Sequence, residues 1–335
     1  MSESSQNTLV PEVVTDPTTD LVVGSLERLA ADAEQLASES LSATTRYCYA
    51  SDWRKWQKWC DSFNMDEYGP AAQLALWITH LVQTGSKVST INRAVSAVAK
   101  AYQAKRLPSP RRDAAVQLVY SGARRRVGVS PEQVEALLPS ALVRVCQHLP
   151  EDSVSRLRSV RNRAAICMGW SGGFRRSELL ALDWEDVQEV PEGLKLRIRR
   201  SKTDQEGRGR LVGLPYASVL VTCPVRSLRA WREACGSPTT GPVFRSVSPN
   251  GQEVLLTRFS ARQFADSIKT ACKDAGLEGR FAGHSLRAGL VTAASAANKP
   301  LSSIMAQTGH KTVEMIVRYM REQGLFDNNA AAGLL

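Results

Sequence analysis

The sequence predicts a mainly α-helical protein, in which a helical N-terminal bundle is followed by a mostly helical C-terminal domain with a small antiparallel β-hairpin or sheet. Apolar residues recur every three or four positions through most of the chain, which is the spacing of one helix face. Within residues 194–200, Leu194, Leu196 and Ile198 alternate with charged residues, as in a strand. The length of 335 residues suits two domains better than one.

A helical domain is predicted for residues 25–126, after a disordered acidic tail at residues 1–24. Apolar residues at helical spacing, such as Trp53, Trp56 and Cys60, indicate the face that a helix would bury. In order along the chain, helices are expected to begin at Ser25, at a Thr44 or Thr45 cap, at Pro70 as the first helical residue, at a Ser89 cap and at Ala114.

A linker is predicted at residues 127–135, followed by a C-terminal domain over residues 136–335. Its first strand, at residues 194–200, should turn through residues 201–209 and return as a second strand at residues 210–214. The remaining periodic segments are predicted to be helices, at residues 139–149, 153–170, 224–235, 257–275, 284–297, 300–308 and 312–322.

The charge of the chain is unevenly distributed. The net charge is +10, yet residues 1–45 hold eight acidic residues and one arginine, which leaves +17 on residues 46–335. A body this basic is typical of a protein that binds a polyanion such as nucleic acid. The alternative is a basic surface without such a partner.

Metal and cofactor sites are not expected. The seven cysteines have no CxxC spacing and an odd count, and there are only four histidines, so neither a zinc site nor a disulfide framework is predicted. No basic residue precedes Arg28, as a secretory leader would require, and no apolar run approaches the roughly 20 residues that span a membrane. We therefore expect a cytoplasmic, nucleoid-associated protein with no membrane partner and no small-molecule cofactor.

Six residues of the C-terminal half form a set suited to phosphodiester cleavage. Arginine binds the nonbridging phosphate oxygens through its planar fork, lysine and histidine can transfer protons, and tyrosine can attack phosphorus to form a covalent intermediate. Each motif is weak alone, since a lone tyrosine or arginine usually lies in a core or on a solvated surface. The set consists of Arg175 in GFRRSEL, Lys202 in RSKT, His284 and Arg287 in HSLR, His310 in TGH, and Tyr319 in VRYM.

The order and spacing of this set resemble the tyrosine site-specific recombinases, the phage integrase family. That family carries an arginine in a G-[LF]-R-x-S-E-L context, a lysine on a β-hairpin, H-x-x-R, G-[HW], and a tyrosine nine residues after that histidine or tryptophan. Residues 44–60 and 87–102 also resemble the DNA-binding helices of the Cre-like branch, whose type member has a tryptophan at the position of His310. The likeness covers about residues 38–335.

The resemblance implies how the bond would be cut. Tyr319 would attack the scissile phosphate and form a 3′-phosphotyrosyl bond, while Arg175 and Arg287 hold the nonbridging oxygens. No metal takes part in this chemistry.

The resemblance also implies roles in proton transfer and positioning. His284 and His310 would position the phosphate or receive the tyrosine proton, and Lys202 would protonate the leaving 5′ oxygen. Glu178, which lies in the first motif, would orient its neighbours; the alternative is ordinary pairing with a nearby arginine on a helix.

Double-stranded DNA with an inverted-repeat target site is the partner that the resemblance implies. Base contacts are predicted at the start of the fourth helix and in the helix at residues 257–275, and phosphate contacts in two basic runs. The alternative for each is a solvated surface charge. The residues predicted to contact DNA are Lys87, Ser89, Thr90, Arg93, Arg124, Arg125, Arg199, Arg200 and Arg262.

The last residues of the chain suggest a homotetramer. Residues 325–335 (LFDNNAAAGLL) are largely apolar, and in Cre-like proteins the last helix docks into the adjacent protomer of a closed ring. The alternative is that this tail packs on its own domain.

The function expected from all of these features is site-specific recombination, with two rounds of cleavage and rejoining through a Holliday junction. A nearer alternative is a type IB topoisomerase or a telomere resolvase, which use the same cleavage chemistry. An alternative from another class is a catalytically silent DNA-binding protein, which would be favoured if Arg175, Arg287 or Tyr319 were replaced.

Overall fold

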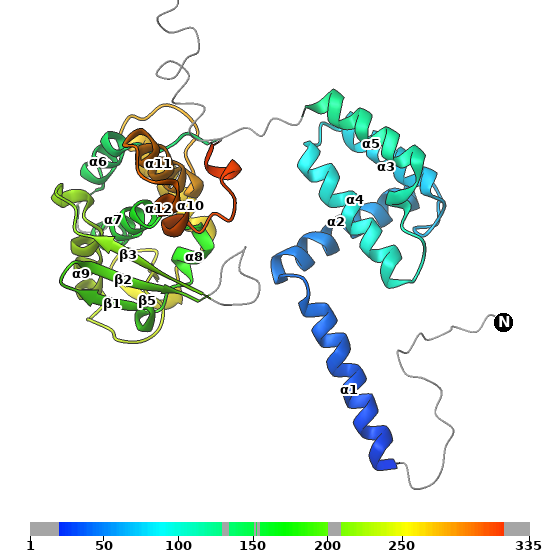
Figure 1. The fold of residues 1–335 in the computed structure, drawn as a ribbon, viewed down its shortest axis with the longest axis horizontal. Helices are drawn as coiled ribbons and strands as arrows, with labels where there is room; N and C mark the ends of the chain where they lie inside the picture. Colours follow the sequence, from blue (N-terminus) through cyan, green and yellow to red (C-terminus); the bar gives the residue numbers. More distant parts are fainter. Residues whose placement is uncertain (1–19, 129–133, 151, 153–154, 200–208, 318–335) are drawn as a thin grey trace, which may run out of the picture. The chain divides into compact units, whose positions relative to one another are not determined.

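The structure is a computed structural model that describes residues 20–128, 134–150, 152, 155–199 and 209–317. The chain divides into an N-terminal unit, Met1–Pro131, and a C-terminal unit, Glu132–Leu335 (Figure 1). The predicted fold class, mainly helical with small antiparallel sheets, is confirmed. Most of the predicted acidic tail and part of the predicted linker lie outside the described residues.

The N-terminal unit is a bundle of helices around an aromatic core. Its helices are α1 (Asp20–Glu39), α2 (Ala43–Ser62), α3 (Ala71–Gln83), α4 (Val88–Ala104), the 3-10 helix η1 (Pro110–Arg112) and α5 (Ala114–Val127). Helix α2 packs against α4, and α3 packs against α5. The core includes Trp56, Trp77 and Tyr102, whose large apolar surfaces supply much of the stabilisation of the bundle. Helix α1 begins at Asp20, before the predicted start at Ser25.

Three further helix starts in this unit, those of α2, α3 and α4, differ from the prediction. Helix α2 is capped by Ser42, whose Oγ accepts a hydrogen bond from the Thr45 N–H at 3.2 Å, so the two predicted threonine caps lie inside the helix. Pro70 is the N-cap residue of α3 and not its first helical residue. Lys87 is the N-cap residue of α4, and Ser89 lies in the first turn. Several polar residues near each start compete for the cap, and sequence alone does not rank them.

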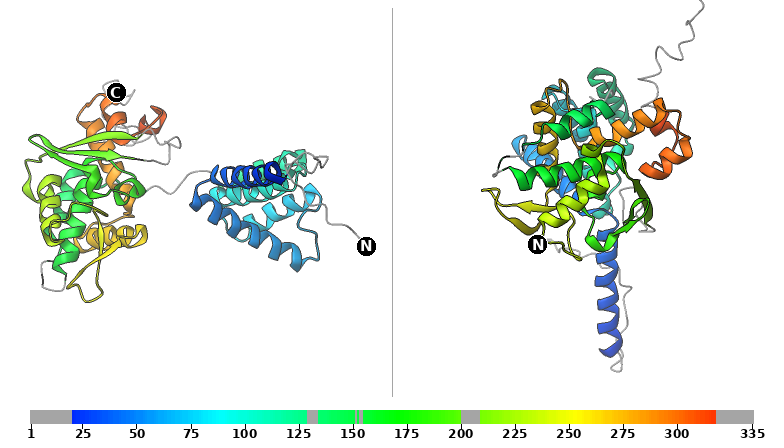
Figure 2. Two further views of the ribbon diagram at one scale, coloured as in Figure 1. Left: turned by 90° about the horizontal axis from the view of Figure 1, so that it is seen from below. Right: turned by 90° about the vertical axis from the view of Figure 1, so that its left-hand side faces the viewer.

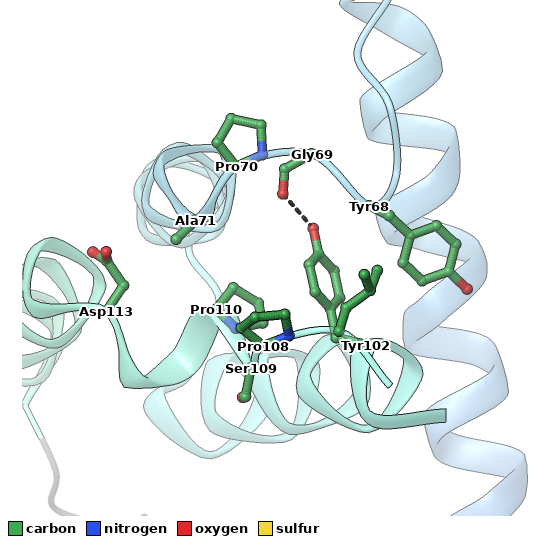
Figure 3. A pocket seen from close by; sticks show the side chains of 10 residues that line it. Tyr68, Gly69, Pro70, Ala71, Tyr102, Pro108, Ser109, Pro110 and Asp113 are labelled. Carbon is green, nitrogen blue, oxygen red and sulfur yellow. Dashed lines mark hydrogen bonds between the residues drawn. The ribbon is translucent and has the colours of Figure 1, made fainter. Parts of the chain in front are cut away.

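A hollow of about 560 Å³ lies in the N-terminal unit, between the start of α3, the end of α4 and η1 (Figure 3). Tyr102 donates a hydrogen bond from its hydroxyl to the Gly69 carbonyl at 2.7 Å and forms one wall. Pro108 and Pro110 also line it, and the Asp113 carboxylate is engaged in capping α5. No residue predicted to act on or contact DNA lines this hollow.

The C-terminal unit is a group of helices with a three-stranded antiparallel sheet at one side (Figures 1 and 2). Its helices are α6 (Pro139–Gln147), α7 (Arg156–Ser171), α8 (Arg176–Leu180), η2 (Trp184–Asp186), η3 (Leu220–Thr222), α9 (Pro224–Ala234), α10 (Ala261–Asp274), α11 (Gly283–Ala296) and α12 (Leu301–Thr308). Its strands are β1 (Val187–Val190), β2 (Gly193–Ile198), β3 (Arg210–Pro215), β4 (Arg245–Val247) and β5 (Val254–Arg258). The predicted helix at residues 312–322 is described only as far as Val317.

The strand prediction was incomplete. The predicted hairpin is present as β2 and β3, but β1 pairs with the other edge of β2, and β4 with β5 forms a second sheet. The predicted helix at residues 257–275 was wrong at its start, because β5 extends to Arg258 and α10 begins at Ala261. Ser260 caps α10, since its Oγ accepts from the Gln263 N–H at 3.2 Å.

The register of β2 and β3 brings one side chain of the hairpin to the predicted active site. Ile198 lies opposite Arg210 in the last pair before the connection at residues 199–209. Arg210 shares a strand face with the buried residues Val212 and Leu214. Because β3 also contacts α12, the Arg210 side chain is directed into the unit.

Candidate active site

Arg175 is held at the junction of α7 and α8 by a sharp turn. Gly173 has a φ of 54°, and a Cβ at this position would lie 2.7 Å from the Thr308 methyl group and 2.8 Å from a methyl group of Leu290. Only glycine fits so close an approach with this backbone conformation. The turn places Arg175 as the N-cap residue of α8, with its side chain 16% exposed.

Glu178 is a buried carboxylate that binds two arginines. Its Oε1 accepts from Arg175 Nη1 at 2.6 Å, and its Oε2 accepts from the Arg175 backbone N–H and from Arg210 Nη2, both at 3.1 Å. Its side chain is fully buried. The carboxylate therefore fixes both guanidinium planes, which goes beyond a pairing within one helix.

Arg287 is buried and reaches the C-terminal end of α12. Its Nη1 donates to the Gly173 carbonyl at 2.7 Å and to the Thr308 carbonyl at 2.6 Å. Gly309, with φ 68° and ψ 36°, ends α12 in the left-handed conformation and leaves the last carbonyls of the helix available as acceptors. Carbonyl oxygens at a helix C-terminus carry partial negative charge, which favours a cation there.

Arg210 was not predicted as an active-site residue. Its Nη1 donates to the Gln307 carbonyl at 2.6 Å, and its Nη2 donates to Glu178 and, at 3.4 Å, to the Thr308 carbonyl. The available signal was an arginine on the buried face of a predicted strand, where a charge needs buried partners. We call Arg175, Arg210, Arg287 and Glu178 the arginine cluster; it holds three guanidinium groups and one carboxylate.

Two histidines lie beside the arginine cluster. His310 is 5% exposed, and its Nδ1 lies 2.8 Å from the Thr308 Oγ1. Burial, helped by the positive charges of Arg287, Arg175 and other nearby groups, lowers the pKa of His310 to about 3. Partial removal from water and the charges of the same two arginines also lower the pKa of His284, although the residue as a whole is exposed. Both rings are thus neutral near pH 7.

The structure brings together Arg175, Glu178, Arg287 and His310, with His284 beside them. Lys202 and Tyr319, the predicted proton donor and nucleophile, lie outside the described residues. The assignment of these two residues therefore remains a prediction from the sequence.

Two residues predicted to contact DNA are engaged in ion pairs. Arg93 binds the buried Asp52 through two hydrogen bonds, of 2.6 and 3.3 Å. Arg199 donates from Nε to Asp186 Oδ1 at 2.6 Å and lies 3.5 Å from Asp183. Both guanidinium groups thus have partners within the protein, although both side chains remain partly exposed, and contact with DNA stays a prediction for each.

The other predicted DNA contacts are more accessible. Arg262 is open to solvent, with 94% of its side chain exposed and a distant pairing to Asp266 at 3.9 Å. Arg200 lies outside the described residues. The remaining candidates are at the start of α4 and the end of α5: Lys87, Ser89, Arg124 and Arg125 are exposed, and Thr90 is half-buried.

The described part of the chain has neither a cluster of metal-binding side chains nor a membrane-spanning helix. No group of three or more His, Cys, Asp or Glu side chains in this part of the chain could hold a metal ion. None of the helices in the described part is both long enough and apolar enough to cross a membrane.

The neutral state of His310 predicts how stability depends on pH. The unfolded ring takes up a proton near its ordinary pKa of 6.5, whereas the folded ring does so only near 3. Between pH 3 and pH 6.5 the unfolded state therefore binds more protons than the folded state. The contribution of the neutral His310 ring to the free energy of unfolding is present above about pH 6.5 and is lost as the pH falls towards 3. From about pH 7 to about pH 5, the free energy of unfolding should fall by about 2 kcal/mol more in wild type than in His310→Gln. Urea unfolding at both pH values checks this; equal losses would contradict it.

Comparisons with known proteins show which proteins the chain resembles. The profile described as the phage integrase family matches residues 135–324. An integrase/recombinase xerD homolog of Selenomonas ruminantium is 30% identical over 308 residues, which cover 91% of this chain and 89% of the relative.

Solved structures show the same fold at low sequence identity. XerH site-specific recombinase, bound to palindromic difH substrate in a post-cleavage complex, aligns with a TM-score of 0.58 at 16% identity, over 84% of this chain and 79% of that chain. A lambda integrase tetramer bound to a Holliday junction aligns with a TM-score of 0.57 at 16% identity, over 85% of this chain and 74% of that chain.

Proposed function

Because the chain belongs to the phage integrase family, the tyrosine recombinases, we propose that it is a site-specific recombinase that cuts and rejoins DNA through a 3′-phosphotyrosyl intermediate. The observation that carries this proposal is the arginine cluster. Arg175 and Arg210 bind the Glu178 carboxylate, and Arg210 and Arg287 donate to carbonyls at the end of α12. Two histidines with lowered pKa lie beside them. This excess of positive charge suits a phosphodiester anion.

In the proposed reaction, Arg175 and Arg287 bind the nonbridging oxygens of the scissile phosphate and Tyr319 attacks the phosphorus. The bond between phosphorus and the 5′ oxygen breaks, and Lys202 protonates the leaving oxygen. The phosphotyrosyl bond conserves the energy of the broken phosphodiester, so rejoining requires no nucleotide. Glu178, which also binds Arg210, keeps Arg175 in position, and the Gly173 and Thr308 carbonyls hold Arg287.

The assembly that we propose is a homotetramer on two inverted-repeat sites of about 30 base pairs, which exchanges strands through a Holliday junction. The N-terminal unit would bind the core of each half-site and the C-terminal unit would cut it. The XerH complex with a palindromic substrate and the lambda integrase tetramer on a Holliday junction support this proposal. Placement in the Cre-like branch and the docking role of the tail at residues 325–335 stay predictions.

Covalent capture tests the proposed function. The full-length protein is incubated with a randomised inverted-repeat library, denatured in detergent, and the attached DNA is recovered and sequenced. Adducts enriched in one inverted repeat are expected, with the protein on the 3′ phosphate and a free 5′ hydroxyl. Retention of DNA under native conditions without any adduct would instead favour the catalytically silent DNA-binding protein.

Product topology separates the recombinase from its chemical relatives. A recombinase given two captured sites on one supercoiled plasmid should produce deletion or inversion products. A type IB topoisomerase would only relax the plasmid, and a telomere resolvase would leave hairpin ends. If the plasmid were only relaxed, or ended in hairpins, the proposal of strand exchange would be wrong. The proposal of cleavage through a phosphotyrosyl bond would still stand.

Arg175→Lys should slow cleavage by at least about 100-fold, because an ammonium point charge cannot reproduce the two-pronged contact of a guanidinium with phosphate oxygens. The measurement is single-turnover adduct formation on the captured site, with DNA affinity determined in parallel. Arg226→Lys, at an exposed position of α9, is the matched control and should cleave at the wild-type rate. Near-normal cleavage by Arg175→Lys would show that Arg175 does not bind the scissile phosphate.

A further inference from the structure

The terminal nitrogens of Arg210, the first residue of β3, are engaged inside the C-terminal unit. Nη1 donates to the Gln307 carbonyl at 2.6 Å and to the Ala306 carbonyl at 3.3 Å. Nη2 donates to Glu178 Oε2 at 3.1 Å and to the Thr308 carbonyl at 3.4 Å. The remaining donor of a guanidinium is on Nε, which is buried here. Arg210 is therefore not arranged to bind a phosphate oxygen, unlike the two arginines proposed to do so.

Arg210 contacts one acceptor of each of these two binding arginines. Glu178 accepts from Arg175 through Oε1 at 2.6 Å and from Arg210 through Oε2. The Thr308 carbonyl accepts from Arg287 at 2.6 Å and also from Arg210. A single planar and rigid guanidinium thus extends from the carboxylate that holds Arg175 to the carbonyl that holds Arg287.

The surroundings of the Arg210 guanidinium fix its place. The side chain is 20% exposed, and the guanidinium carbon lies 5.9 Å from the centre of the Phe174 ring. Gly309 has a φ of 68°, and a Cβ built on it would lie 2.9 Å from Arg210 Nε and 3.2 Å from Arg210 Cζ. The close approach of this glycine backbone leaves the guanidinium little room to move.

We propose that Arg210 is a positioning residue, which sets the spacing between the guanidinium groups of Arg175 and Arg287 so that both can bind oxygens of one phosphate. This inference rests on the proposed function. Two arginines bind one phosphate together only where their separation matches that of its oxygens, and a misplacement of about 1 Å can slow a reaction by about 100-fold. Arg210 does not touch the phosphate and acts through the other two arginines.

Backbone contacts should keep the binding arginines near the site when Arg210 is replaced. Arg287 Nη1 also donates to the Gly173 carbonyl at 2.7 Å, and Arg175 Nη2 lies 3.5 Å from the Gly309 carbonyl. Replacement of Arg210 should therefore change the spacing of the two guanidinium groups without removing either from the site.

Two variants separate the spacing from the charge of Arg210. Arg210→Lys keeps the positive charge, but one ammonium cannot reach both Glu178 and the end of α12. Arg210→Met removes the charge as well. If only the charge of Arg210 matters, the lysine variant should behave as wild type; if the spacing matters, both variants should be impaired. Arg144→Lys is the matched control, because Arg144 also donates to carbonyls at the end of a helix, those of Ala275 and Gly276 after α10, outside the arginine cluster.

The first readout is the affinity for inorganic phosphate, which needs no DNA. Calorimetric titration of wild type and of Arg175→Lys identifies the part of phosphate binding that depends on the arginine cluster. That part should be at least about fivefold weaker in Arg210→Lys and unchanged in Arg144→Lys, although all these proteins have the same net charge. Equal affinity in folded Arg210→Lys and wild type, or no part of the binding that depends on Arg175, would overturn the proposal.

The second readout is single-turnover adduct formation with the captured site. Arg210→Lys and Arg210→Met should both form the adduct at least about tenfold more slowly than wild type, with unchanged DNA affinity, and Arg144→Lys should cleave normally. A role in stability alone would lower the free energy of unfolding, measured with urea, and leave the cleavage rate of the folded Arg210→Lys protein at the wild-type value. That result would overturn the positioning role.

A double-mutant cycle tests whether Arg210 acts through Arg175. With Arg175→Lys already present, no spacing between two guanidinium groups remains to be set, so adding Arg210→Lys should slow cleavage by less than about threefold more. Independent effects, in which the two losses multiply, would contradict the proposal. If wild type formed no adduct on any DNA, the proposed function would fail, while the phosphate titration would still decide whether Arg210 sets the spacing.

Discussion

Tyr319→Phe is expected to abolish every covalent protein–DNA adduct while DNA affinity stays within about twofold of wild type. The substitution removes one oxygen atom, and that atom is the proposed nucleophile. The groups that would bind the phosphate, Arg175 and Arg287, are untouched, and so is Arg210 beside them. The substitution should therefore block the covalent step without changing DNA binding. Adduct formation should fall further than it would in a variant that lacks one of the binding arginines.

The measurement compares detergent-resistant adducts and native DNA binding for the same captured site. Tyr216→Phe is the matched control in the same unit, because its hydroxyl accepts from Arg229 at the surface and lies outside the arginine cluster. Normal adduct formation is expected for that variant. Adducts that persist in Tyr319→Phe would show that another side chain is the nucleophile, and adducts lost from both variants would point to damage of the fold.

The sequence predicted the helices well, because their signal is local. Trp56 and Cys60 recur at helical spacing, and both are buried in α2. The predictions were wrong or incomplete where the structure of a segment depends on contacts that its own sequence pattern does not specify. Strand β4 spans three residues, too few for an alternating pattern, and it exists because β5 pairs with it. The cap of α2 depended on which of several nearby hydroxyls meets a backbone N–H, and Ser42 does so.

The same distinction applies to the candidate active site. Arg175, His284, Arg287 and His310 were found from motifs and spacing, which need no knowledge of contacts. Arg210 was missed because its partners, Glu178 and the last carbonyls of α12, are far from it in sequence. A motif does not predict how deeply these residues are buried or which histidines are protonated. Both properties depend on how α8, α11, α12 and β3 pack together.

Glu178→Gln is expected to lower the free energy of unfolding by about 3–5 kcal/mol, since it removes the negative partner of a buried ion pair and leaves the positive charges in place. Glu178 is fully buried, with Arg175 at 2.6 Å and Arg210 at 3.1 Å. Glu189→Gln is the matched control: Glu189 also pairs with an arginine, Arg229, but both side chains are exposed to solvent. That variant should lose less than about 1 kcal/mol. Urea unfolding of the full chain gives the totals, and hydrogen exchange in α8 and α12 locates the loss.

The Glu178→Gln variant also tests whether the arginine cluster is built for an anion. Without the carboxylate, the cluster has three positive charges and no negative one. A bound anion should therefore offset the repulsion between these charges, and stabilise the variant more than it stabilises wild type. Inorganic phosphate, and separately the captured DNA site, should therefore raise the melting temperature of Glu178→Gln by more than they raise that of wild type. An equal rise in both proteins would mean that the anion binds away from the cluster, in which case the buried charges would serve the fold and the proposed phosphate site would have to be sought elsewhere.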